Sequence, residues 1–209
     1  MSSMTLIEKE LQESLNTFIL SSQSDSLKEN LQLAIDLCVK SLSKGGKIMF
    51  MGNGGSAADA QHLAAELICR FKTSRPAIAA IALTTDTSAL TAIANDFSFK
   101  DIFQRQIEGL GKPEDVIIAI STSGQSGNII DGVIRAKTKG IQVIGMTGQV
   151  KSNLDDLSDV TLKVPSLITA KIQEVHICLG HILCQAIESA FTPEQAADIH
   201  EEELLSQEG

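Results

Sequence analysis

The chain has 209 residues, enough for one well-buried domain, and its seven Phe with no Tyr or Trp leave the core to aliphatic side chains. Its 17 Lys and Arg against 26 Asp and Glu give a net charge of −9 without a long basic run, which excludes nucleic-acid binding through a basic patch. We see no signal segment and no run of roughly 20 apolar residues, so we expect a soluble cytoplasmic protein with no membrane contact. The cysteines have no paired spacing, so we expect them to be reduced core residues.

Two amphipathic helices are predicted at the start of the chain, over residues 4–20 and 25–44, because their leucines recur at helical spacing. Gly45 and Gly46 end the second helix. We expect residues 1–45 to pack on the rest of the domain and on neighbouring subunits.

Strand-like and helical patterns alternate after this point. The strand-like runs are 47–51, 79–83, 115–121, 141–146 and 160–164. Helical patterns cover 56–71, 87–94, 100–110, 127–139 and about 170–190. Such alternation predicts right-handed crossovers and an α/β fold, a flavodoxin-like three-layer sandwich with a parallel sheet of about five strands. We assign this domain to residues 46–192, and residues 193–209 to an acidic tail that forms a short helix or a frayed end.

A glycine-rich turn follows the first predicted strand and is the most informative segment of the chain. Asn53, Gly54, Gly55 and Ser56 join that strand to a helix. Backbone N–H groups at the positive end of a helix are suited to hold a phosphate. The carboxyl ends of parallel strands are where ligands collect in such sheets, so this turn is a candidate phosphate site.

A second polar turn, with the sequence STSGQS, follows the third strand at the same edge of the sheet. Its hydroxyls and helix N-terminus can bind phosphate without a cation, as a net-negative protein requires. The alternative is an ordinary serine-rich turn with a helix cap. The presence of two such turns at one edge favours the phosphate site.

Two helices carry polar residues on otherwise apolar faces. His62 and Glu66 are four residues apart, so they share one face of the helix after the glycine turn. Either they are a solvated pair, or, as the small and apolar neighbours favour, they belong to a site. The last helix carries Gln173, Glu174, His176 and His181, which are either satisfied core groups, a site, or a polar seam between subunits.

These motifs together resemble the sugar isomerase (SIS) domain family. The residues that carry the resemblance are NGGSAADAQH with AE after it, the segment from Arg75 to Phe97, STSG.S, and the late IQE.H with a second histidine. More narrowly, the chain resembles bacterial phosphoheptose isomerases, which convert D-sedoheptulose 7-phosphate into D-glycero-D-manno-heptose 7-phosphate through an enediol. That reaction is the first step of ADP-heptose synthesis for the lipopolysaccharide inner core.

The resemblance implies a role for each matching residue. Glu66 is implied as general base and acid, and His181 as the group that moves protons on the sugar oxygens. The implied phosphate ligands are Ser121, Thr122, Ser123 and Ser126 with the amides around Gly54, Gly55 and Ser56. The residues implied to contact the rest of the sugar are Asn53, Glu66, Asn95, Asp96 and Gln173, although Asn95 and Asp96 also fit a simple helix cap and turn.

The resemblance also implies one Zn²⁺ ion per subunit, held by His62, Glu66, Gln173 and His181. Two imidazoles and a carboxylate suit zinc, whereas an amide oxygen is an uncommon fourth ligand. Gln173 and His181 are separated by roughly 12 Å along one helix. Either their side chains lean toward each other, or another subunit supplies one of them. Thr169, Ala170 and Lys171 stand where some relatives have an acidic residue, so a further acid or base is not expected there.

Two other functions occur among proteins with this domain. Non-catalytic SIS proteins that bind the bacterial replication initiator lack the carboxylate and the late histidine that Glu66 and His181 provide here. Sugar-phosphate-sensing regulators add a DNA-binding domain, and no basic helix-turn-helix segment occurs in this sequence. The apolar faces of the last helix and of the leading helices exceed what one sheet can cover, so a homo-oligomer is expected. The resemblance makes it a tetramer with sites at subunit interfaces.

Overall fold

The sheet is fully parallel, as predicted. The computed structural model describes residues 3–192, so the predicted tail, 193–209, lies outside the described residues. Within that range the strands are β1 (Ile48–Gly52), β2 (Ala80–Ala82), β3 (Val116–Ile120), β4 (Gln142–Thr147) and β5 (Val160–Lys163). They pair in the order β2-β1-β3-β4-β5. This is the strand order of a flavodoxin-like sandwich.

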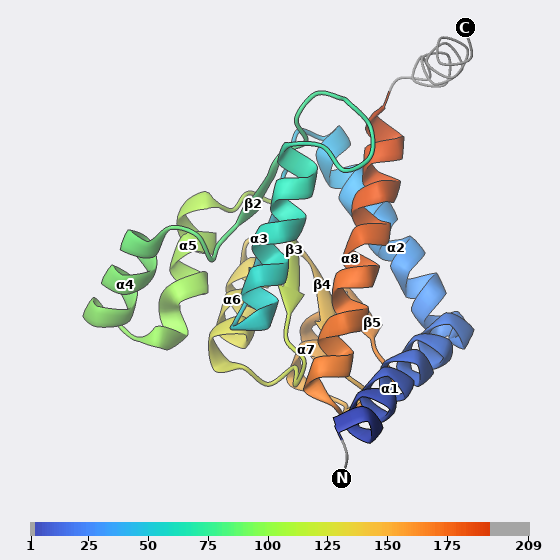
Figure 1. Cartoon of the computed structure of the whole chain (residues 1–209). Coiled ribbons are helices and arrows are strands. Elements are labelled where there is room, and N and C mark those ends of the chain that lie inside the picture. The colour runs from blue at the N-terminus through green and yellow to red at the C-terminus, as the bar shows by residue number, and fades with distance from the viewer. Residues whose placement is uncertain (1–2, 193–209) are drawn as a thin grey trace, which may run out of the picture.

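Helices cover both faces of the sheet (Figure 1). On one side lie α2 (Asp25–Ser43), α3 (Gly55–Ile68) and α8 (Thr169–Phe191), with α1 (Ser3–Gln23) resting against α8. On the other side lie α5 (Ile102–Leu110), α6 (Gly127–Thr138) and the short α7 (Asn153–Leu157). The helix α4 (Thr87–Asp96) and the 3₁₀ turn η1 (Phe99–Asp101) extend beyond the β2 edge. The predicted three layers and two leading helices are confirmed.

The strands are apolar on both faces because both faces are covered. In β1, Ile48 and Phe50 pack among α2, α3 and α8, whereas Met49 and Met51 pack among α5 and α6. All four side chains are fully buried. A strand buried on both sides shows a continuous apolar run rather than an alternating one, which is why β1 and β3 stand out in the sequence.

Two predictions about the helices are corrected. The helix α7 was not predicted, because its five residues are too few to show a period; a capping box between Ser152 and Asp155 begins it. The helix α3 ends at Ile68 instead of residue 71. Cys69 is therefore exposed, and the prediction that all four cysteines lie in the core is wrong for this one. Cys38 and Cys184 are buried and Cys178 is partly buried, and all four are free thiols.

No helix within residues 3–192 combines the length and the apolar character needed to cross a bilayer.

The connections reverse direction at β1. From β1 the chain moves outward to β2 on one side, and then returns to β3 on the other side. Such a switch point opens a crevice at the carboxyl ends of the two strands. The turns that follow β1 and β3 are the two polar turns singled out in the sequence.

Candidate active site

The first turn places the start of α3 beside the last helix. Gly54 has a φ of +56°, a conformation that glycine adopts without strain. A Cβ on Gly55 would lie 2.6 Å from Nε2 of Gln173, so only glycine lets the Gln173 carboxamide rest against this helix terminus. The Ser56 amide donates to the Asn53 carbonyl at 3.0 Å, which closes the turn.

The second turn is ordered by its own hydroxyls. Ser121 Oγ accepts from the Gly124 amide at 3.1 Å and lies 3.2 Å from Ser126 Oγ. Ser123 Oγ accepts from the Gln125 amide at 3.2 Å. Gly124 has a φ of +62° and packs so closely on Ser152 that a Cβ would overlap it. The hydroxyls predicted to hold phosphate therefore lie on a fixed backbone.

A reciprocal amide pair joins the two turns. Asn53 donates to Oδ1 of Asn128 at 2.9 Å, and Asn128 donates back to Oδ1 of Asn53 at 2.8 Å. Asn128 is buried in the first turn of α6, and its own Oδ1 also accepts from the Ile129 amide. The sequence analysis did not single out Asn128. The pair holds the N-termini of α3 and α6 side by side.

A cleft of about 320 Å³ opens next to the second turn. Thr122, Ser123 and Gln125 line it from that turn, and Thr169 lines it from the start of α8. Hydroxyl and amide groups share the wall with the apolar side chains of Val150, Leu167 and Ile172. The cleft can therefore hold a polar ligand that reaches the serine turn.

Three of the four predicted metal ligands come together on α3 and α8. His62 Nε2 lies 2.8 Å from His181 Nε2 and 3.2 Å from Glu66 Oε1. One ligand atom from each residue lies within 4.8 Å of the others. We call His62, Glu66 and His181 the triad. The helices approach closely here because residue 180 is glycine: a Cβ would lie 2.6 Å from Leu63.

The triad faces solvent in the single chain. The His62 side chain is 48% exposed and the Glu66 side chain 21% exposed. Gln173 rests instead against Gly55, about two helical turns before His62. Its role as a fourth ligand thus stays a prediction.

Asp59 is a neighbouring acid that the sequence analysis missed. It precedes His62 by three residues, so the two share one face of α3. One carboxylate oxygen of Asp59 is buried without a hydrogen-bond partner in the described part of the chain. Burial raises the pKa of Asp59, and the nearby His62 partly opposes this shift. The three-residue spacing to His62 is the feature of the sequence that could have identified Asp59 as a site residue.

Asn95 and Asp96 lie apart from these groups within one chain. They close α4, where the Asn95 amide donates to Asp96 at 2.8 Å on the protein surface. Figure 1 shows α4 beyond the β2 edge, away from α8. Their contact with the sugar therefore stays a prediction.

The other polar residues of α8 have structural partners. His176 is buried, its Nε2 lies 3.2 Å from the Thr147 carbonyl, and burial lowers its pKa to about 4, so its ring is neutral. Glu174 pairs with Lys171, which also pairs with Glu10 of α1. Of the three alternatives for His176, the structure favours a core histidine over a site or a subunit seam.

The fold, the two turns and the triad define a sugar isomerase domain. The family model described as "SIS domain" matches residues 14–148. A phosphoheptose isomerase of Paramagnetospirillum magneticum is 48% identical over 90% of this chain and 97% of its own length. One from Campylobacter jejuni is 49% identical over 89% and 98%. The solved structure of a phosphoheptose isomerase from Neisseria gonorrhoeae superposes with a TM-score of 0.84, at 41% identity over 90% of this chain and 100% of that one.

The chain therefore belongs to the SIS domain family, in the branch formed by the phosphoheptose isomerases. A second solved structure, from Francisella tularensis, gives a TM-score of 0.87 at 35% identity over 90% of this chain and 100% of that one. The resemblance inferred from the sequence is confirmed.

Proposed function

We propose that the protein is an aldose–ketose isomerase that converts D-sedoheptulose 7-phosphate into D-glycero-D-manno-heptose 7-phosphate. The observation that carries this proposal is the triad, in which Glu66 lies beside two imidazoles on paired helices. A non-catalytic SIS protein has no need for such a group. The relatives with 48–49% identity bear the name of this enzyme.

Isomerisation requires one carbon to lose a proton and the adjacent carbon to gain one. Glu66 takes the proton from C1 of the ketose, which leaves an enediol, and returns it to C2. His181 moves a proton between the two sugar oxygens. Glu66 Oε1 lies 3.2 Å from His62 Nε2, so an imidazole stands beside the proposed base.

Zinc fits the donor set of the triad. Ligands about 2.0–2.1 Å from a tetrahedral ion lie roughly 3.3 Å apart, and the 2.8 and 3.2 Å separations of the triad atoms are close to this. His62, Glu66 and His181 would hold the ion, with Gln173 proposed as the fourth ligand. A bound zinc ion would polarise the sugar carbonyl and stabilise negative charge on its oxygen.

The two turns are proposed to hold the phosphate and Asn53, Asn95, Asp96 and Gln173 to contact the sugar. Replacing both Ser121 and Ser123 by alanine should raise KM more than tenfold with little change in kcat. Each lost charge-assisted hydrogen bond costs about 1.5–3 kcal/mol, and the phosphate is held equally before and after the proton transfer. Steady-state kinetics measures both constants.

Ser189→Ala serves as the control for that double variant. Ser189 is exposed on α8 and its hydroxyl donates only along its own helix, to the Gln185 carbonyl. An unchanged KM in the Ser121→Ala/Ser123→Ala protein would remove these two hydroxyls from the phosphate site.

We further propose a cytoplasmic homotetramer with active sites at subunit interfaces. The exposure of His62 and Glu66 in the single chain supports the interface site. Proton transfer at carbon is favoured where water is excluded, and a neighbouring subunit would exclude it. Residues 1–45 would then pack on the SIS domain, 46–192, and on neighbouring subunits. The product would enter ADP-heptose synthesis for lipopolysaccharide.

The test of the function is direct. Protein stripped of metal is incubated with sedoheptulose 7-phosphate, with and without added Zn²⁺, and aldose formation is followed. We expect turnover that depends on the added metal. Failure to form the aldose both with and without added Zn²⁺ would refute the proposal.

A further inference from the structure

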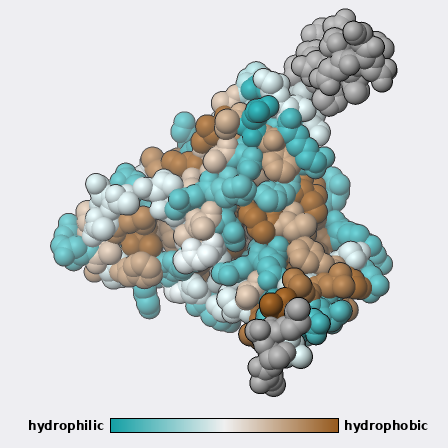
Figure 2. Space-filling view, viewed as in Figure 1, coloured by the Kyte–Doolittle hydropathy of each residue, from teal (hydrophilic) through white to brown (hydrophobic). Residues whose placement is uncertain are grey.

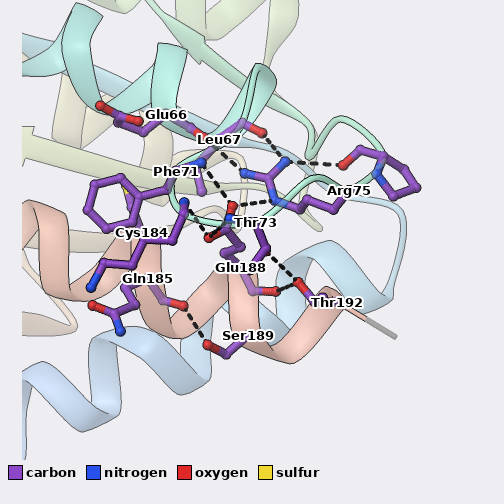
Figure 3. A network of polar contacts seen from close by, with 12 residues as sticks. Glu66, Leu67, Phe71, Thr73, Arg75, Cys184, Gln185, Glu188, Ser189 and Thr192 are labelled. Atoms are coloured by element: carbon purple, nitrogen blue, oxygen red, sulfur yellow. Dashed lines mark hydrogen bonds and ion pairs between the residues drawn. The ribbon is translucent and has the colours of Figure 1, made fainter. Parts of the chain in front are cut away.

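The loop between α3 and β2, residues 69–79, is organised by one buried carboxylate of α8. Glu188 accepts hydrogen bonds from the amides of Phe71 at 2.8 Å, Lys72 at 2.7 Å and Thr73 at 3.2 Å (Figure 3). Its side chain is 3% exposed. Burial works against the charge, but the three amides and Arg75 outweigh it, so the pKa of Glu188 lies below its usual value. The carboxylate is therefore ionised and fully paired.

Arg75 connects this carboxylate to the end of α3. Its fully buried side chain donates to Glu188 Oε1 at 3.1 Å. The guanidinium also donates to the carbonyl of Glu66 at 2.9 Å and to that of Leu67 at 2.7 Å (Figure 3). These carbonyls belong to the last turn of α3, where a positive charge is favourable. Arg75 thus fixes the turn that carries Glu66.

The same loop reaches the triad through Phe71. Its ring stacks on His181, with the ring centroids 5.5 Å apart and the planes at 26°. His181 in turn meets the His62 ring edge-on at 5.1 Å. Phe71 therefore occupies one side of the His181 ring and limits how that ring can turn.

Two contacts thus join the network to the triad, one at the backbone of Glu66 and one at the ring of His181. A buried ion pair is a costly way to hold a loop, since apolar residues of similar volume often do as well. Here the rigid pair aligns groups on two helices at once, which apolar packing would do less specifically.

We propose that Glu188 and Arg75 are positioning residues that hold the 69–79 loop. The loop keeps Phe71 stacked on His181, which sets the orientation of the His181 ring. Arg75 caps the last turn of α3, which sets the orientation of Glu66. Only the kinetic test of this inference rests on the proposed isomerase activity. The orientation itself can be measured in the protein without metal or substrate.

The main test variant is Phe71→Leu, which removes the ring and keeps the Glu188 contacts to the backbone. We expect kcat to fall about tenfold and KM to change less than twofold, since the phosphate turns are untouched. In the metal-free protein the NMR signals of the His181 ring should shift and broaden as the stacked ring is lost. Thr73→Val is the matched control, because within residues 3–192 its hydroxyl bonds only to Thr192, and its amide still reaches Glu188.

A second variant, Glu188→Gln, tests the loop directly. Hydrogen exchange at the amides of Phe71, Lys72 and Thr73 should accelerate at least tenfold, and kcat should fall as in Phe71→Leu. If Glu188→Gln fails to fold, Phe71→Leu alone decides. Unchanged His181 signals and unchanged kcat in Phe71→Leu would overturn the proposal. An inactive wild-type protein would refute the isomerase function, and the NMR and exchange results would still decide the positioning role.

Discussion

Glu66→Gln should lower kcat by about 10²–10⁴-fold and leave the fold intact. Positioned general acid–base groups contribute a factor of this size, and the amide has the shape of the carboxylate without its capacity to take up a proton. Glu66 is partly exposed on α3, so thermal unfolding of the variant should match that of the parent chain. Deuterium incorporation at the reacting carbon in D₂O, followed by NMR, should fall in proportion to kcat.

Metal loss is the competing explanation, because Glu66 is also a proposed ligand. His62→Asn serves as the control, since it weakens the same metal site without removing the proposed base. At saturating Zn²⁺ we expect His62→Asn to regain a measurable part of its activity and Glu66→Gln to stay inactive. Substantial activity in Glu66→Gln would place the base elsewhere, with Asp59 and Asp96 as the next candidates.

Placing glutamates at Leu11 and Leu15 should dissociate the assembly and abolish activity. These side chains of α1 are 66% and 52% exposed in the single chain. They belong to an apolar stripe along α1 that also includes Leu6, Ile7, Phe18, Ile19 and Leu20. Figure 2 shows apolar side chains gathered over this helix. Soluble monomers seldom expose such a patch, so we expect neighbouring copies to cover it.

Light scattering measures this outcome. The parent protein should have about four times the 22.3 kDa mass of one chain, and the Leu11→Glu/Leu15→Glu protein should have the mass of one. Ile134→Glu is the control, because Ile134 is a similarly exposed apolar residue on α6, across the sheet. A stable, active monomer of either the parent or the double variant would contradict an interface site.

The sequence predicted the central strands well because β1 and β3 are continuous apolar runs with polar or glycine boundaries. The run predicted over 115–121, for example, is β3, Val116–Ile120. The face shared by His62 and Glu66 followed from helical spacing alone. The contact with His181 needed the family resemblance, because it joins positions 119 residues apart and depends on how closely α8 approaches α3 at Gly180.

The supporting contacts could not be predicted in the same way. Glu188 and Arg75 are 113 residues apart, and neither stands in a recognisable local pattern. An acid in the largely apolar second half of α8 was the one available hint, because a buried carboxylate needs partners. Asn128 was equally hidden, since an asparagine early in a helix is common without any such pairing.

The reciprocal pair of Asn53 and Asn128 has a consequence for how tightly substrate and product bind. Two neutral amides keep the turns together, and their hydrogen bonds do not change with protonation across the physiological range. The proposed product carries the same phosphate as the substrate, so the preformed turns should bind the phosphates of both with similar affinity. Net flux toward the aldose is then set by the concentrations of substrate and product, and so by the next step that consumes the aldose.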